Sequence, residues 1–458
     1  MKRSHIAAAK AVAMQTGEAI EHVLLRLGHV AEEDIQATSA RLHGTQLISL
    51  RKQYVDQSLA LAIPEPIARR YRCLALRRLR GSVMVAMGNL SDLMRAISDL
   101  DYPKTKLDVK LLLEEDDEET IATVRRYHLP PHFKVVIVPH SKPKGKPKAC
   151  NYGLIHAEGE YIVIYDAEDI PERDQLKKAL VAFRKAPQNV GCIQAKLNYY
   201  NRDQNLLTRW FTTEYSMWFD LFMPALDASN APVPLGGTSN HFPTTLLREI
   251  GAWDPYSVTE DADLGMRLFK AGWKTAIIDS TTYEEANSEI YNWIRQRSRW
   301  VKGYMQTYLV HMRHPFKLLR EIGLYQFFSF NIVVGGTVFG FLMNPLYWLL
   351  TAAWFLTHSS IIQQLFPGPI FYVGAMGLYF GNFAFTYANV AGCMRRQYYD
   401  MVKYALLSPV YWALMSIGAW KGLIQLLYDP SYWEKTAHGL YRGEVNLGQQ
   451  ALPTSEDL

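Results

Sequence analysis

The chain has 458 residues, with 49 Lys and Arg against 44 Asp and Glu, and 49% of its residues are hydrophobic. This length predicts two or three folded regions, and the hydrophobic content excludes a disordered chain. The net charge is only +5 and the basic residues are scattered, which argues against nucleic acid as a partner. The cysteines have neither CxxC nor Cys/His zinc spacing, so no disulfide framework or structural zinc site is expected; they are Cys73, Cys150, Cys192 and Cys393.

Residues 1–98 form the first predicted unit, a small α+β module. Their opening segment has no apolar core long enough for export, so this part is expected to be cytoplasmic. Apolar spacing predicts helix, then strands, then helix, with Pro64 and Pro66 at a helix start. The order of these elements around Ile63-Pro64-Glu65 and Val85-Ala86-Met87 resembles the N-terminal domain of type II secretion and pilus ATPases.

That first resemblance implies a docking or regulatory module with a protein partner. Some members of the ATPase family bind cyclic di-GMP through paired repeats that begin with Arg-Leu-Gly. One such triplet, Arg26-Leu27-Gly28, is present here without its paired repeat. Docking of a protein is therefore favoured over nucleotide binding.

Residues 99–321 alternate between strand-like and helical segments. The predicted helices are 175–185 and 260–272, and the predicted strands are 107–115, 134–140, 160–169, 190–197 and 274–280. Such alternation predicts an α/β domain with a mostly parallel sheet. In these sheets the chemistry lies beyond the carboxyl ends of the strands.

Three carboxylates follow the strand at 160–165 within four residues: Asp166, Glu168 and Asp169. Their mutual repulsion is relieved when a cation joins them. A divalent metal that holds a diphosphate is the simplest interpretation. A solvated acidic turn is the alternative for this segment taken alone.

Further polar motifs follow along the chain. Glu260 and Asp261 stand at the start of a predicted helix. Either they stabilise its first turn as negative charges, or one of the carboxylates serves as a base that takes the proton of an attacking hydroxyl. Gly236 and Gly237 allow a ligand to approach the backbone closely, although a tight turn also explains them. The segment Gln296–Trp300 places an amide, a cation and an indole on one helical face, or it is an interfacial anchor.

Residues 322–428 are predicted to form transmembrane helices. From Ile322 to Met394 there is no charged residue in 73 positions, enough for two or three crossings of ~20 residues, and the segment 404–428 offers one more. Buried helices of a large soluble domain are the alternative. Asn344-Pro345 is expected to separate the first crossing from the second.

The basic residues between 295 and 320 predict that everything N-terminal to the membrane region is cytoplasmic. Arg395 and Arg396 also favour the cytoplasmic side, which conflicts with three crossings before them and leaves the number of spans open. Residues 429–458 are predicted to be a cytoplasmic tail. The expected location is the inner membrane, with several crossings.

Taken together, these motifs resemble the processive glycosyltransferases of family two, which include bacterial cellulose, chitin and hyaluronan synthases. The resemblance covers residues 100–438. The matching segments are Glu114–Asp117, Lys148-Ala149-Cys150-Asn151, Asp166–Asp169, Gly236-Gly237-Thr238, Thr259-Glu260-Asp261 and Gln296–Trp300. As a set, T-E-D followed by Q-x-x-R-W directly before membrane helices is highly specific.

The resemblance implies a GT-A domain with a Rossmann-like mixed sheet, a UDP-sugar donor, a glycan acceptor and Mg²⁺ or Mn²⁺ as the cofactor. It assigns the metal to Asp166 with Glu168 or Asp169, and the general base to Asp261 beside Glu260, in a single displacement with inversion. Trp300 stacks on the acceptor. The residues implied in nucleotide-sugar binding are Glu114, Asp116, Lys148, Asn151, Asp166, Gly237, Thr238, Gln296 and Arg299.

One departure from the family concerns the start of the GT-A domain. Leu100-Asp101-Tyr102-Pro103 follows directly on the N-terminal module, so the first strand, which helps to form the uridine pocket, is missing. Residues 82–100 have the length and order of the missing strand, turn and helix. Either they replace it or the sheet keeps an open edge. In the second case the protein is a catalytically impaired membrane receptor or assembly subunit.

Overall fold

A computed structural model describes residues 73–79, 82–87, 92–125, 129–365, 368–434 and 436. The chain divides into two compact units, one of Met1–Val109 with Pro130–His132, the other of Lys110–Leu129 with Phe133–Leu458. Most of the predicted N-terminal module, including the Arg26-Leu27-Gly28 triplet, lies outside the described residues. Its resemblance to the ATPase domain stays a prediction.

The first unit contains a β-hairpin and a short helix. Strands β1 (Cys73–Leu79) and β2 (Ser82–Met87) pair antiparallel with each other in a separate two-stranded sheet. Helix α5 (Asp92–Ser98) follows and buries Ile97, and the turn η3 (Lys104–Lys106) leads to the next strand. The replacement of the first GT-A strand by residues 82–100 therefore stays a prediction.

The second unit contains a two-stranded and a five-stranded sheet. Strand β3 (Val109–Glu114) pairs with β4 (Phe133–Val138). The larger sheet has the order β5-β8-β7-β9-β6, with β5 (Tyr161–Val163), β6 (Ile170–Pro171), β7 (Val190–Tyr199), β8 (Asn240–Pro243) and β9 (Lys274–Glu284). Among the described residues no strand joins the two sheets.

The larger sheet is mixed, as expected, but it is not mostly parallel. Among the adjacent pairs of described strands in this sheet, only β7 with β9 is parallel. The pairs β5 with β8, β7 with β8, and β6 with β9 are antiparallel. The physical reason is the connection from β7 to β8, which runs through several helices and reverses the direction of the chain. Strand β8 then enters the sheet between β5 and β7. Residues 240–243 were not predicted as a strand because they are too short and too polar for a hydrophobic period.

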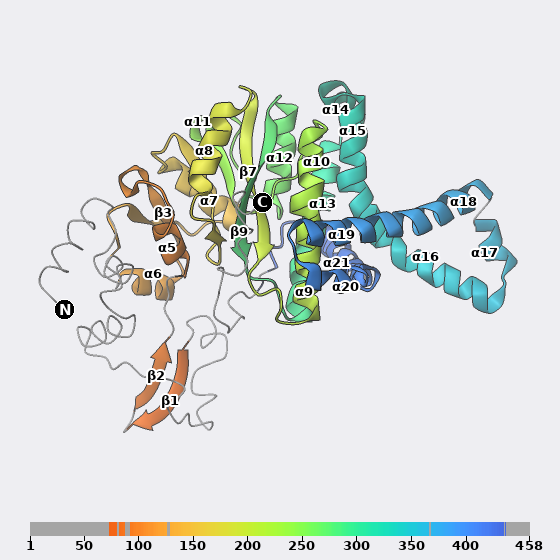
Figure 1. The fold of residues 1–458 in the computed structure, drawn as a ribbon, viewed down its shortest axis with the longest axis horizontal. Helices are drawn as coiled ribbons and strands as arrows, with labels where there is room; N and C mark the ends of the chain where they lie inside the picture. Colours follow the sequence, from red (N-terminus) through yellow and green to blue (C-terminus); the bar gives the residue numbers. More distant parts are fainter. Residues whose placement is uncertain are drawn as a thin grey trace, which may run out of the picture. The chain divides into compact units, whose positions relative to one another are not determined.

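Helices cover this sheet and supply its core (Figure 1). Ala179 of α8 packs with Ile193 and Ile278 of the central strands, and Leu264 of α12 packs in a second cluster with Phe242. The helices of this part are α6 (Glu118–Arg125), α7 (Lys146–Ile155), α8 (Gln175–Lys185), α9 (Leu206–Met217), η4 (Trp218–Phe222), α10 (Met223–Ala228), α11 (Thr244–Glu249), α12 (Glu260–Lys270) and α13 (Ile290–His311).

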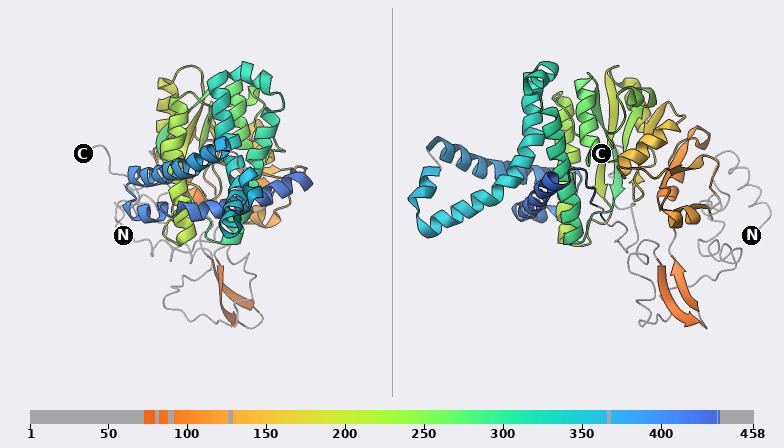
Figure 2. Two further views of the ribbon diagram at one scale, coloured as in Figure 1. Left: turned by 90° about the vertical axis from the view of Figure 1, so that its right-hand side faces the viewer. Right: turned by 180° about the vertical axis from the view of Figure 1, so that it is seen from behind.

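The C-terminal helices leave the sheet region and return to it. Figures 1 and 2 show α16 and α18 projecting away from the sheet, joined at the far end by α17. The elements are α14 (Pro315–Ile322), α15 (Leu324–Phe330), η5 (Asn331–Gly336), α16 (Thr337–Thr357), α17 (Ser360–Leu365), α18 (Gly368–Met376), η6 (Gly377–Gly381), α19 (Asn382–Arg395), η7 (Tyr399–Met401), α20 (Val402–Ala405) and α21 (Ser408–Tyr428).

Two continuous helical stretches of the described residues are long and apolar enough to cross a membrane: Leu324–Thr357 and Ser408–Tyr428. The first leads outward, and the chain returns through α18 and α19 to Arg396, which donates to Asp220 and, at 3.4 Å, to Thr281 Oγ1. Arg396 therefore lies against the sheet domain. The second stretch, α21, packs closely on α13, where a Cβ added to Gly422 would lie 2.7 Å from the carbonyl oxygen of Ser298.

Candidate active site

The predicted acidic motif forms a tight loop between β5 and β6. Asp169 is fully buried, and its Oδ2 accepts hydrogen bonds from the backbone N–H of Asp166 at 2.6 Å and from the hydroxyl of Thr238. Burial, with Asp166 and Glu168 nearby, raises the pKa of Asp169 well above its usual range. Asp169 therefore holds the loop together from within. The side chain of Asp166 is 37% exposed and points out of the loop.

Lys146, which none of the sequence motifs included, forms an ion pair with Asp166. The ammonium of Lys146, at the start of α7, is 2.5 Å from Asp166 Oδ1 and donates to the carbonyl of Gly237 at 2.6 Å. Burial alone lowers the pKa of Lys146, but the nearby carboxylates of Asp166 and Glu260 raise it above the ordinary value. Lys146 is therefore fully charged and joins the acidic loop to the glycine loop.

The glycine loop meets the start of α12. A Cβ added to Gly237 would lie 3.5 Å from Asp261 Oδ2 and 3.9 Å from Lys146 Nζ, so both side chains face this loop. Glu260 is 5% exposed. Burial and the neighbouring Asp261 raise the pKa of Glu260 to about 7, and burial raises that of Asp261 as well. The next carboxylate, Asp263, is instead bound by Arg267 at 2.7 Å and His311 at 3.0 Å, which fixes α12 to α13.

Helix α13 contributes the side chains of the predicted Q-x-x-R-W motif. Arg299 is held near the carboxylates of Glu260, Asp261 and Asp166, although burial lowers its pKa. Among the described residues, Arg299 Nε and the buried Oε1 of Gln296 have no hydrogen-bond partner. Buried polar groups are normally paired, so these two atoms are available to a ligand.

Trp300 belongs to an aromatic cluster beside the site. Its ring stacks with Tyr215 at a centroid distance of 6.3 Å and meets Phe211 edge-on at 5.9 Å, while the guanidinium of Arg297 lies 4.7 Å from its centroid. Arg297 is held in turn by both oxygens of Glu214, with one bond of 3.0 Å, and by Tyr411 at 2.8 Å. Arg297, which lies within the Gln296–Trp300 motif, thus positions Trp300.

Residues 429–434, called here the C-terminal strap, run back over α13 after α21. Glu434 accepts hydrogen bonds from Lys421 at 2.7 Å, Gln425 at 2.8 Å and Ser298 at 3.1 Å. Trp433 lies under the guanidinium of Arg299, 4.6 Å from its ring centroid. The sequence analysis placed residues 429–458 in a tail without naming this contact of Trp433 with Arg299, which depends on how α21 packs.

Other predicted nucleotide-binding residues have partners within the fold. Lys148 donates to Glu114 Oε2 at 2.8 Å, and Asp116 accepts from Lys144 at 2.6 Å. The amide of Asn151 is bound at both of its ends by the backbone of Trp253, at 2.7 and 3.1 Å. Lys148, Asp116 and Asn151 thus contact Glu114, Lys144 and Trp253, whereas Asp166 contacts Lys146.

The residues present fit a divalent cation that is shared with a substrate. Among the described residues there is no group of three His, Cys, Asp or Glu arranged around one point. Mg²⁺ is usually held by one or two carboxylates together with substrate phosphates, and the outward-facing Asp166 supplies such a carboxylate. The buried Asp169 Oδ1 has no described partner but faces the interior of the loop.

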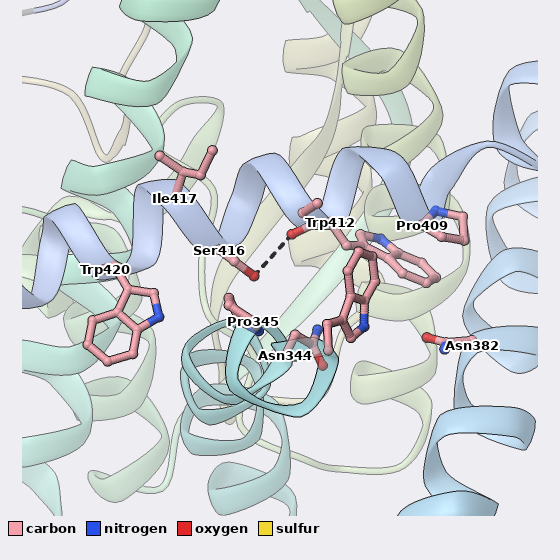
Figure 3. A pocket seen from close by; sticks show the side chains of 10 residues that line it. Asn344, Pro345, Asn382, Pro409, Trp412, Ser416, Ile417 and Trp420 are labelled. Carbon is pink, nitrogen blue, oxygen red and sulfur yellow. Dashed lines mark hydrogen bonds between the residues drawn. The ribbon is translucent and has the colours of Figure 1, made fainter. Parts of the chain in front are cut away.

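A cavity of about 400 Å³ lies between α16, α19 and α21, on the face of α21 that is turned away from α13. Figure 3 shows Trp412, Ser416 and Trp420 of α21 opposite Asn344 and Pro345. Ser416 donates to the carbonyl of Trp412 at 3.2 Å, and Trp420 donates to that of Leu342 at 3.1 Å. None of the predicted site residues lines this cavity.

Residues 161–366 match the family described as "Glycosyl transferase family group 2". This match agrees with the motifs, several of which lie within these residues. The chain is 25% identical over 265 residues to the probable glycosyltransferase YdaM of Bacillus subtilis (strain 168), covering 55% of this chain and 60% of the relative.

Two further relatives have more specific names. The beta-monoglucosyldiacylglycerol synthase of Synechocystis sp. is 25% identical over 256 residues, covering 54% of this chain and 53% of the relative. The probable glucomannan 4-beta-mannosyltransferase 7 of Oryza sativa is 28% identical over 266 residues, covering 54% and 45%. These matches span roughly half the length of the relatives. A solved mannosyltransferase, PcManGT from Pyrobaculum calidifontis in complex with GDP-Man and Mn²⁺, has a TM-score of 0.47 and 19% identity over 74% of this chain and 83% of that chain.

Proposed function

We propose that this protein is a membrane-bound inverting glycosyltransferase that transfers a sugar from a UDP-sugar to a glycan or glycolipid acceptor with the aid of Mg²⁺ or Mn²⁺. The observation that carries the proposal is the meeting of Asp166, Gly237 and Asp261 around one point, with Arg299 close by. The names of two relatives, which refer to a diacylglycerol and to glucomannan, supply the two acceptor classes to test.

The proposed chemistry is a single displacement at the anomeric carbon. The acceptor hydroxyl loses its proton to Asp261 while its oxygen bonds to that carbon, and the bond from the carbon to the diphosphate oxygen breaks. The guanidinium of Arg299 would compensate the charge that develops on the leaving diphosphate, and the unpaired amide oxygen of Gln296 would accept a hydrogen bond from a ligand hydroxyl. A cation on Asp166 would further neutralise that charge. Trp300 offers an apolar face to the acceptor sugar.

Membrane attachment is proposed from the arrangement of the C-terminal helices. The stretch 324–357 would cross the bilayer and α18 with α19 would return, so Arg395 and Arg396 would share the cytoplasmic side with the catalytic domain. With two crossings, Arg395, Arg396 and the basic segment before α15 would all lie on the cytoplasmic side, as the positive-inside tendency favours. Because α21 packs along α13, it would lie at the membrane surface with Ile424 and Leu427 toward lipid.

A screen of UDP-sugars with purified protein in detergent tests this function. GDP-sugars, diacylglycerol and oligosaccharide acceptors form the other arms, each with and without Mn²⁺. We expect metal-dependent transfer that falls about 100- to 10,000-fold in Asp261→Asn, the range of a lost general base. Equal turnover in wild type and Asp261→Asn would remove the assigned base.

The second candidate is a catalytically impaired membrane receptor or assembly subunit. The observation in its favour is the split between the β3–β4 sheet and the five-stranded sheet, which leaves no described strand where the uridine pocket is expected. Absence of transfer with every donor, combined with a tight complex between residues 1–98 and a cellular protein, would support this candidate.

A further inference from the structure

The ammonium of Lys146 occupies the centre of the candidate site. It bridges Asp166 Oδ1 at 2.5 Å and the Gly237 carbonyl at 2.6 Å. The position of a Cβ on Gly237 would lie between this ammonium, at 3.9 Å, and Asp261 Oδ2, at 3.5 Å. Lys146 thus binds the carboxylate assigned to the metal and shares the Gly237 loop with the carboxylate assigned to the base.

Three lysines occur at alternate positions here, and each binds a different carboxylate. Lys144 pairs with Asp116 at 2.6 Å and Lys148 with Glu114 at 2.8 Å, both on the side of β3. Only Lys146, of these three, contacts the acidic loop after β5. Its place follows from the start of α7, whose first residue is Lys146.

We propose that Lys146 is an internal counter-cation, which holds Asp166 while the donor is absent and must leave this carboxylate when a divalent metal binds. Two cations cannot share one carboxylate oxygen at ion-pair distance without strong repulsion. A metal ion alone therefore has to displace Lys146 and leave its ammonium with fewer partners. A nucleotide diphosphate that arrives with the metal offers the ammonium a new anion.

Positive coupling between metal and nucleotide follows from this competition. Binding of either ligand lowers the free-energy cost of moving Lys146 away from Asp166 when the other binds. The coupling free energy has the same size in both directions. Typical coupling of this kind corresponds to about 5- to 150-fold in affinity. Lys146 acts as a positioning residue here, which sets the order in which the site is filled.

This inference rests on the proposed function and is tested by direct binding of Mn²⁺ to the full chain in detergent. Free Mn²⁺ is measured by electron paramagnetic resonance, with and without UDP. The variants are Lys146→Met, Lys146→Arg and Lys185→Met, of which the last has the same change of net charge at an exposed position at the end of α8, outside the site. Transfer is assayed separately on the same samples.

In wild type and Lys185→Met, we expect UDP to tighten Mn²⁺ binding at least about tenfold. Lys146→Met should bind Mn²⁺ alone about tenfold more tightly, with most of the effect of UDP gone, and Lys146→Arg should resemble wild type. Equal Mn²⁺ affinity of Lys146→Met and wild type would overturn the inference while active transfer leaves the proposed function standing. No Mn²⁺ or UDP binding by any variant, together with no transfer, would overturn both.

Discussion

Replacement of Glu260 by glutamine removes a buried charge that destabilises the folded state. Glu260 is 5% exposed, and its pKa is raised from 4.5 to about 7, first by burial and then by Asp261. A tenfold change in proton affinity corresponds to about 1.4 kcal/mol, so a charged Glu260 costs the folded state about 3 kcal/mol. Glutamine has nearly the same shape and stays neutral at every pH.

The sign of the effect follows from which state binds the proton more tightly. The folded protein does, so the contribution of Glu260 to stability is fully present below pH 4.5 and is lost as the pH rises through about 7. Glu260→Gln should therefore melt at a higher temperature than wild type at pH 8 and at a similar temperature at pH 5. With about 2–4 °C per kcal/mol for a domain of this size, the gain at pH 8 is about 6–12 °C.

Thermal unfolding followed by tryptophan fluorescence at pH 5 and pH 8 measures this difference. Glu249→Gln is the matched control, because Glu249 is exposed in α11. The reasoning is wrong if Glu260→Gln and wild type melt together at pH 8, or if the gain is the same at both pH values. A stabilised Glu260→Gln with reduced transfer would show that the charge is kept for function.

Three further variants test separate parts of the site. Gly237→Ala should fold normally, because its Cβ would make only ordinary contacts at 3.5 and 3.9 Å, but it should weaken UDP binding in calorimetry by filling the space where the donor approaches. Arg297→Met leaves Glu214 with Tyr411 as a donor at 2.7 Å but without its cationic partner, and should lower the stability in thermal unfolding by about 1.5–3 kcal/mol, whereas unchanged melting would contradict a structural role for this ion pair. Lys421→Met should loosen the C-terminal strap and speed hydrogen exchange in residues 429–434, with α12 unaffected as the internal reference.

The sequence by itself determined the chemistry-bearing segments and most of the elements that carry them. The helices at 175–185 and 260–270 follow from hydrophobic period, and the strand from 190 follows from a short apolar run, since β7 is buried on both faces. Asp166, Gly237 and Asp261 could be named from short motifs, because side-chain chemistry is local to the sequence. The similarity of residues 161–366 to the family 2 model agrees with those motifs.

Only the tertiary structure decided the partners of these residues and the shape of the sheet. Lys146 and Lys148 look alike in sequence, yet one reaches Asp166 and the other Glu114, because the direction of a side chain depends on how α7 packs. The antiparallel β8 and the fold-back of the C-terminal strap onto Arg299 likewise depend on contacts between segments far apart in the chain. Such contacts have no local pattern, since the free energy that selects them comes from burial and charge pairing in the assembled fold.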